Sequence, residues 1–153
     1  MANAAVIYDS KHGNTKTVAE SIAAGLRDGG VVDVLVLRVD AAKREALAGY
    51  DALVIGSPNH MGGATRRVKR LISSLSELQG KLVAVFDTYM GKDSEKAVGR
   101  MLKRLGDIVP GIETITPGLS VLVNGLTGPI ADGELAKSKA FGERIAARLG
   151  ERS

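Results

Sequence analysis

The sequence predicts a doubly wound α/β domain, in which helices cover both faces of a parallel sheet. Segments of strand and helix character alternate along the chain. The strand segments are almost continuously apolar, which is typical of strands buried on both faces. Three of them run directly into polar, glycine-containing loops at residues 10–15, 57–63 and 87–94. Because ligands bind beyond the carboxyl ends of parallel strands, we expect these loops to carry the function.

The first strand is an apolar run that starts near Val6 and breaks into the polar loop Ser10–Thr15. After the loop, the apolar residues recur at the spacing of one helical face: Val18, Ala19, Ile22, Ala23 and Leu26. This stretch therefore predicts a strand, a tight loop and a helix. A helix that starts here directs its unpaired backbone N–H groups and its positive dipole end into the loop.

The remaining elements follow in alternation. Further strands are predicted at residues 31–37, 51–56, 81–86, 112–116 and 119–123. Further helices are predicted at residues 42–47, 64–78, 95–105 and 132–149. The last two strand segments are either a strand pair or one strand interrupted at Pro117–Gly118. The interruption favours a place at the sheet edge, where a missing ladder hydrogen bond is tolerated.

Length and composition suit one globular domain spanning residues 1–153, with 44% hydrophobic and 25% charged residues. We find no apolar run long enough for a membrane helix and no signal-peptide pattern, so we expect a cytoplasmic protein with no membrane association. The chain has no cysteine and only two histidines, His12 and His60. Disulfides, thiol nucleophiles and cysteine-ligated metal centres are excluded, and we expect no metal site. Chemistry would come from a bound cofactor or from hydroxyl, carboxyl and amino groups.

The formal net charge is +4 and the sequence pI is about 9.5. Part of the positive charge falls on two amphipathic helical patterns, in the clusters Arg66-Arg67-Lys69-Arg70 and Arg100-Lys103-Arg104. These clusters are read either as solvated helix faces or as a surface for an anionic partner. Few aromatic residues are present, and no basic stripe alternates with stacking side chains. A nucleic-acid partner is therefore not expected.

The first loop has the donor groups that a phosphate monoester requires. Ser10 and Thr15 supply hydroxyls, Asn14 supplies an amide, Lys11 adds positive charge, and Gly13 allows close backbone approach. An ordinary capped strand–helix turn uses the same residue types, so the loop alone leaves both readings open. Two nucleotide motifs are excluded, because the loop has neither the Walker spacing nor the three glycines of a dinucleotide-binding turn.

Taken together, the three loops resemble those of the flavodoxin-like FMN-binding family. Ser10-Lys11-His12-Gly13-Asn14-Thr15 is similar to the family's phosphate loop, and Gly56-Ser57-Pro58-Asn59-His60-Met61-Gly62 to the loop beside the flavin ring. Asp87-Thr88-Tyr89-Met90-Gly91 stands where the family covers the other side of the ring. The resemblance extends over the whole chain. It implies a three-layer fold with a five-stranded parallel sheet in the order 2-1-3-4-5.

The resemblance also implies FMN as the cofactor and a set of contacts from each loop. The cofactor-binding residues that we expect are Ser10, Lys11, His12, Gly13, Asn14, Thr15, Ser57, Pro58, Asn59, His60, Met61, Gly62, Asp87, Thr88, Tyr89, Met90 and Gly91. Tyr89 is the only aromatic residue in the two ring-facing loops. Many relatives carry a second aromatic in the 57–62 loop, where this chain has His60 and Met61.

The implied function is electron transfer, as an FMN flavoprotein that carries single electrons between redox partner proteins. No catalytic residue is assigned. The alternative is a flavin-dependent oxidoreductase that acts on a quinone, on protoporphyrinogen or on NAD(P)H. The basic helices favour acidic redox partners, and we expect a monomer or a weak dimer.

Overall fold

A computed structural model describes residues 2–152. The strands form one parallel sheet in the order β2-β1-β3-β4-β5, and β6 also pairs with β4. Their bounds are Asn3–Tyr8 (β1), Asp33–Arg38 (β2), Ala52–Pro58 (β3), Leu82–Tyr89 (β4), Glu113–Thr114 (β5) and Leu119–Leu122 (β6). The predicted strand order is confirmed, with β6 as an additional segment.

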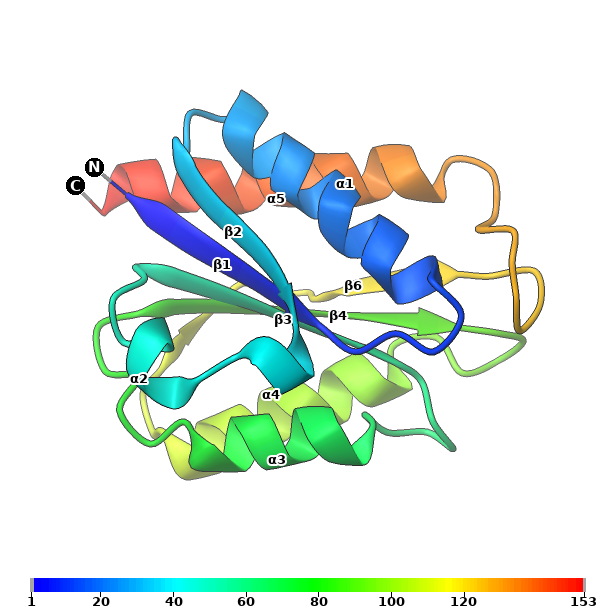
Figure 1. Cartoon of the computed structure of the whole chain (residues 1–153), viewed down its shortest axis with the longest axis horizontal. Helices are drawn as coiled ribbons and strands as arrows, with labels where there is room; N and C mark the ends of the chain where they lie inside the picture. The colour runs from blue at the N-terminus through cyan, green and yellow to red at the C-terminus, as the bar shows by residue number, and fades with distance from the viewer. Residues whose placement is uncertain (1, 153) are drawn as a thin grey trace.

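Helices cover both faces of the sheet (Figure 1). Helices α1 (Asn14–Asp28) and α5 (Glu134–Glu151) pack on one face, and α3 (Arg66–Ser74) and α4 (Lys96–Ile108) on the other. A 3₁₀ turn, η1 (Val39–Ala41), and the short helix α2 (Arg44–Leu47) join β2 to β3. Within residues 2–152, no helix combines the length and the apolar character needed to cross a bilayer.

The last strand is one interrupted edge strand and not a strand pair. Its first half, β5, pairs in parallel with Leu82 and Val83 of β4, and its second half, β6, pairs in parallel with Phe86–Tyr89. Pro117 and Gly118 lie between the two halves. Both halves therefore lie beside the same neighbour, at an edge position that tolerates the missing ladder hydrogen bonds.

Helix α3 is shorter than its apolar periodicity predicts. Thr65 caps its first turn by accepting a hydrogen bond from the Val68 N–H, and the helix ends at Ser74. The Ser74 hydroxyl donates to the Leu71 carbonyl at 2.6 Å, a local bond that competes with helix continuation. Leu75 and Leu78 are still buried, so the apolar spacing continues beyond the helix.

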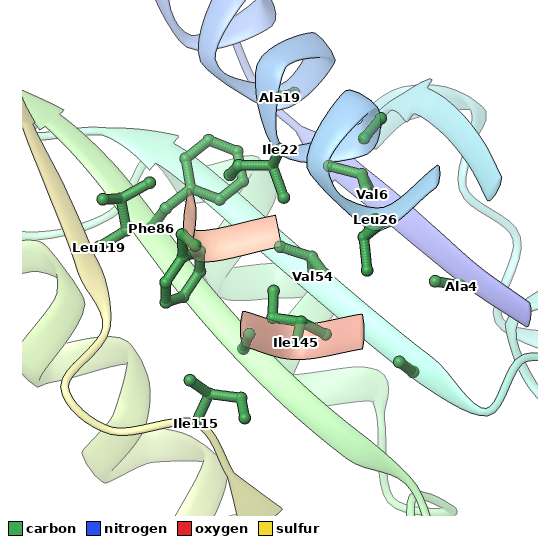
Figure 2. Packing of buried hydrophobic residues seen from close by; sticks show 14 of the residues in the cluster. Ala4, Val6, Ala19, Ile22, Leu26, Val54, Phe86, Ile115, Leu119 and Ile145 are labelled. Atoms are coloured by element: carbon green, nitrogen blue, oxygen red, sulfur yellow. The ribbon is translucent and has the colours of Figure 1, made fainter. Parts of the chain in front are cut away.

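The core under α1 and α5 is built around Phe86 of β4 (Figure 2). The Phe86 ring is fully buried and crosses the neighbouring strand at Gly56, its partner in the β3–β4 register. A Cβ atom at Gly56 would lie 1.9 Å from the Phe86 Cζ. Glycine is therefore required at this position in β3, immediately before the strand reaches the 57–63 loop.

Helices α1 and α5 approach closely through two glycines. A Cβ at Gly142 would lie 2.1 Å from the Ile22 carbonyl oxygen, and one at Gly25 would lie 2.0 Å from the Lys139 carbonyl oxygen. Because both obstacles are backbone atoms, the helices would have to separate to admit a methyl group. These contacts hold α1 in place above β1, and they place the start of α1 at the end of that strand.

We expect Gly142→Ala to destabilise the protein by roughly 1–3 kcal/mol, because overpacking exceeds the gain of about 1 kcal/mol in helix propensity. Gly106→Ala in α4 is the matched control, since its Cβ would meet no atom within 4 Å. This control should leave the protein equally stable or more stable. Urea unfolding of both variants tests this expectation, and a Gly142→Ala variant as stable as Gly106→Ala would contradict the close approach.

Candidate functional site

Four loops follow the carboxyl ends of β1, β3, β4 and β6, toward the right of Figure 1. Their residues line one cleft. Three of these loops are the ones singled out in the sequence. The residues that line the cleft are Ser10, Lys11, His12, Asn14, Thr15, Pro58, Asn59, Thr88, Tyr89, Met90, Val123, Gly125 and Leu126. No carboxylate is among them. The cleft is thus polar at one end and suited electrostatically to an anion.

The polar end of the cleft is the N-terminus of α1. Gly13 takes a left-handed conformation with φ of 91°, and its N–H donates to the Ser10 hydroxyl oxygen at 3.0 Å. No side chain caps the helix, and the Thr17 N–H is the first to bond back, to the Gly13 carbonyl. The preceding three backbone N–H groups, from residues 14–16, are therefore left for a ligand or solvent. Together with the helix dipole, they form an anion site.

The first loop is fixed to β4 by a buried pair of hydroxyls. The side-chain oxygens of Thr15 and Thr88 lie 3.0 Å apart, and both residues are buried. On the open side of the loop, Lys11 and His12 are exposed. This arrangement gives the loop a rigid inner side and a positively charged outer side.

The second loop closes on itself as a tight turn. The His60 N–H donates to the Gly63 carbonyl at 2.7 Å, and the Gly63 N–H donates to the His60 carbonyl at 3.2 Å. Met61 and Gly62 both have positive φ, 56° and 84°, as the two central residues of a type I′ turn require. Met61 is 92% exposed. A methionine in this conformation is strained, and it presents its thioether chain to solvent.

Hydrogen bonds from Asn59 hold this turn against the third loop. The Asn59 N–H donates to the Thr88 carbonyl at 2.7 Å, and its side-chain amide donates to the Asp93 carbonyl at 3.2 Å. Its side-chain oxygen accepts from the Gly62 N–H at 2.8 Å. Asn59 therefore connects the second loop both to β4 and to the segment before α4.

The third loop lines the cleft with three consecutive residues, Thr88, Tyr89 and Met90. Thr88 is buried, Tyr89 is half-buried, and Met90 is 43% exposed. Gly91 follows with a φ of 66° and does not line the cleft. Tyr89 is the only Phe, Trp or Tyr side chain among the lining residues.

Seven of the residues expected at the site do not line the cleft: Gly13, Ser57, His60, Met61, Gly62, Asp87 and Gly91. Two of these, Ser57 and Asp87, point away from it. Ser57 and Asp87 are fully buried and are paired in the β3–β4 register. Strand side chains alternate between faces, and Leu53 and Ile55 of the same strand pack in the core beneath α3 and α4. Ser57 and Asp87 therefore point toward that layer and away from the cleft. The Ser57 hydroxyl accepts from the Thr65 N–H at 2.9 Å and so helps to start α3.

Asp87 is a buried carboxylate with a shifted proton affinity. Desolvation raises the pKa of Asp87 to about 6, against the lowering effect of hydrogen bonds from the Ser120 hydroxyl and the Val98 N–H. The nearby charge of Glu95 raises the pKa further, and that of Lys137 lowers it. The carboxylate oxygens hold β6 and the first turn of α4 in place. Asp87 is thus a structural group behind the third loop.

The Asp87 pKa predicts a specific pH dependence of stability. Between the ordinary value of 3.8 and about 6, the folded protein holds a proton that the unfolded chain releases, so rising pH lowers stability. Asp87→Asn removes this contribution. The stability of the variant relative to the wild type should therefore rise by about 3 kcal/mol from pH 3.5 to pH 7.

Urea unfolding across this pH range measures the difference, and Asp132→Asn, at an exposed position, serves as a control for net charge. A difference between wild type and Asp87→Asn that does not vary with pH would contradict the shifted pKa.

The fourth loop was not among those predicted. Val123, Gly125 and Leu126 close the cleft on the β6 side, and the Asn14 amide donates to the Leu126 carbonyl at 3.5 Å. The turn residues Asn124-Gly125 after the last strand were the available signal. The cleft lies at the carboxyl ends of the strands. The loop that follows β6 therefore lines it together with the loops that follow β1, β3 and β4.

Comparisons with known proteins agree with this architecture. A family model described as "Flavodoxin domain" matches residues 5–114. A flavodoxin from Aquifex aeolicus is 32% identical over 122 residues, which cover 73% of this chain and 66% of that protein. A flavodoxin from Clostridium saccharobutylicum is 28% identical over 158 residues, covering 94% of this chain and 95% of that protein.

A solved structure of a flavodoxin from the domain Archaea superposes with a TM-score of 0.83 at 26% identity, covering 97% of this chain and 99% of that one. An NAD(P)H dehydrogenase (quinone) from Archaeoglobus fulgidus is 31% identical over 117 residues, which cover 56% of this chain and 61% of that protein.

The sheet order, the loops at the strand ends and the family match over most of the sequence lead to one assignment. The chain belongs to the flavodoxin family, whose members bind FMN and transfer electrons to redox partner proteins.

Proposed function

We propose that this protein binds FMN in the four-loop cleft and carries electrons between partner proteins. The observation that carries the proposal is the uncapped N-terminus of α1, which opens into a cleft lined by no carboxylate. A phosphate monoester satisfies both features, because it accepts hydrogen bonds from the helix N–H groups and is attracted by the helix dipole. FMN is a cofactor that joins such a phosphate to a flat aromatic ring.

In this proposal the first loop holds the phosphate. The backbone N–H groups at the start of α1 and the hydroxyls of Ser10 and Thr15 donate to it, and Lys11 and His12 add polar contacts from the exposed side. The hydrogen bond from the Gly13 N–H to the Ser10 hydroxyl oxygen, at 3.0 Å, holds the two ends of the turn together. Preorganised donors of this kind lower the cost of binding.

The flavin ring lies, in the same proposal, between the second and third loops. Tyr89 offers an aromatic face, and aromatic stacking contributes roughly 0.5–1.5 kcal/mol beyond burial. Met61 supplies a flexible, polarizable side chain from the type I′ turn. Its strained backbone and high exposure are consistent with a side chain kept for a ligand. Bound FMN supplies one-electron chemistry, while the protein orients the ring and controls access to it.

A second function, NAD(P)H-dependent quinone reduction, has one observation in its favour, the 31% identity to the Archaeoglobus fulgidus enzyme. That match covers 56% of this chain. The cleft lining holds no carboxylate, and its titratable side chains are Lys11, His12 and Tyr89, of which Lys11 and His12 lie at the proposed phosphate end. Electron carriage needs no acid–base group at the site, so we place it first. Steady-state NAD(P)H oxidation with a quinone separates the two functions.

We also propose that the redox partners are acidic, on the basis of the net charge of +4 and the exposed basic residues of α3 and α4. Complementary charge speeds the encounter of proteins and orients their approach. The protein acts as a monomer or weak dimer in this proposal.

Purified protein tests the cofactor directly. We expect a yellow solution with flavin absorption, and release of FMN, not FAD, on denaturation. A colourless protein that does not take up added FMN would overturn the proposal.

A charged variant at the helix start sharpens this test. Asn14→Asp places a carboxylate at the first position of α1, where it favours the helix dipole and repels a phosphate. The variant loses the long, exposed bond from the Asn14 amide to the Leu126 carbonyl, and the helix dipole offsets that loss. We therefore expect nearly unchanged stability together with an FMN affinity at least about tenfold weaker. Ala136→Asp in the first turn of α5 is the matched control, and equal FMN affinity in the two variants would argue against a phosphate at α1.

A further inference from the structure

A second hollow lies between α3 and α4, outside the cleft. Its volume is about 300 Å³. The lining residues are Ala64, Lys69, Ile72, Arg100, Met101, Lys103, Arg104 and Asp107. We refer to it as the α3–α4 groove. Its floor is apolar where Ile72 and Met101 are buried, and its walls carry cations from both helices.

The cations of the groove are only partly neutralised. Lys103 pairs with Asp107 at 3.3 Å, and Arg104 donates to the Ser73 hydroxyl oxygen. Among residues 2–152, neither Lys69 nor Arg100 forms an ion pair. Positive charge therefore remains exposed at the end of the groove that these two residues share.

Helix α3 carries further positive charges at its surface. Arg66, Arg67 and Arg70 are exposed on α3, and Arg66 and Arg70 stand four residues apart. Like charges at this spacing destabilise a helix by a few tenths of a kcal/mol. The charge cluster therefore does not serve the stability of the helix, and it makes the surface of α3 attractive to an anionic partner.

The groove is continuous with the second loop of the proposed flavin site. A Cβ atom at Gly62 would lie 3.7 Å from the Arg100 guanidinium, and one at Gly63 would lie 3.3 Å from it. The same atom at Gly63 would lie 3.7 Å from the Lys69 Cε. Arg100 and Lys69 thus pack on the two glycines of the turn next to Met61.

We propose that the α3–α4 groove docks an acidic segment of a redox partner protein, and that Arg100 and Lys69 hold this segment beside the 60–63 turn. The inference rests on the proposed function, since it places the partner next to the flavin ring. Charge complementarity identifies the occupant as acidic. A protein segment fits better than a lone phosphate, because the cations are spread over two helices and surround an apolar floor. The groove contains no aromatic side chain on which nucleic-acid bases would stack.

Amide chemical-shift mapping on the FMN-loaded 153-residue protein tests the inference, with a synthetic peptide of glutamates and interspersed leucines as the probe. We expect shifts at Gly62, Gly63, Lys69 and Arg100, and affinity that falls as salt rises. The double variant Lys69→Glu/Arg100→Glu should bind the peptide at least about tenfold more weakly.

Lys43→Glu/Arg44→Glu is the matched control, because it reverses two exposed cations at the start of α2 and changes the net charge equally. We expect this control to bind the peptide within about twofold of the wild type. The inference is overturned if the shifts map outside the groove, if both double variants lose affinity equally, or if inorganic phosphate or a DNA duplex binds the groove as tightly as the peptide does.

The flavin absorption of each sample separates this inference from the proposed function. A protein without FMN would refute the function, whereas peptide mapping would still report on the groove. Retention of FMN by Lys69→Glu/Arg100→Glu together with loss of the peptide supports a docking surface that is distinct from the cofactor contacts.

Discussion

The start of α1 is the constraint on which the rest of the site depends. Gly13 reverses the chain at the end of β1 in a left-handed conformation, and the helix that follows has no side-chain cap. The close contacts at Gly25 and Gly142 fix this helix against α5. In the sheet, β1 lies between β2 and β3, so the chain first moves from β1 toward one edge of the sheet and then returns past β1 toward the other edge. The strand order therefore reverses at the carboxyl end of β1. The switch leaves a crevice there, into which the uncapped helix points.

The packing beneath the cleft determines how the other loops reach it. Because Gly56 has no side chain, the Phe86 ring packs over β3 at this position. Strands β3 and β4 stay paired up to Pro58 and Thr88, so the second and third loops begin side by side. Asn59 then bonds to both β4 and the segment before α4. On the other side of the second loop, Arg100 packs against Gly62 and Gly63 of the 60–63 turn. The proposed cofactor and the proposed partner would thus share one boundary.

The sequence was sufficient for the architecture because buried parallel strands and amphipathic helices leave strong periodic signals, and the three polar loops follow strand ends. The sequence was not sufficient to predict which residues face the cleft, because that depends on the direction of each side chain in the folded protein. Ser57 and Asp87 belong to sequence motifs that resemble those of the family, but they are the last inward-facing residues of β3 and β4, and strand alternation points them into the layer beneath α3 and α4. The Val123–Leu126 stretch begins at the end of the strand predicted at residues 119–123, but it went unassigned because it lacks the hydroxyl and charged side chains that marked the first loop. The Arg100 contact with the glycine turn depends on tertiary packing, which no spacing encodes.

The affinities of the apoprotein for FMN and for riboflavin, compared by fluorescence titration at equal ionic strength, test the role of α1 most directly. The two ligands share the ring and differ in the phosphate. If the uncapped helix and the Ser10–Thr15 loop hold the phosphate, FMN should bind at least about a hundredfold more tightly, equivalent to roughly 3 kcal/mol. Equal affinities would mean that the phosphate makes no contact with this helix, and would contradict the site described here.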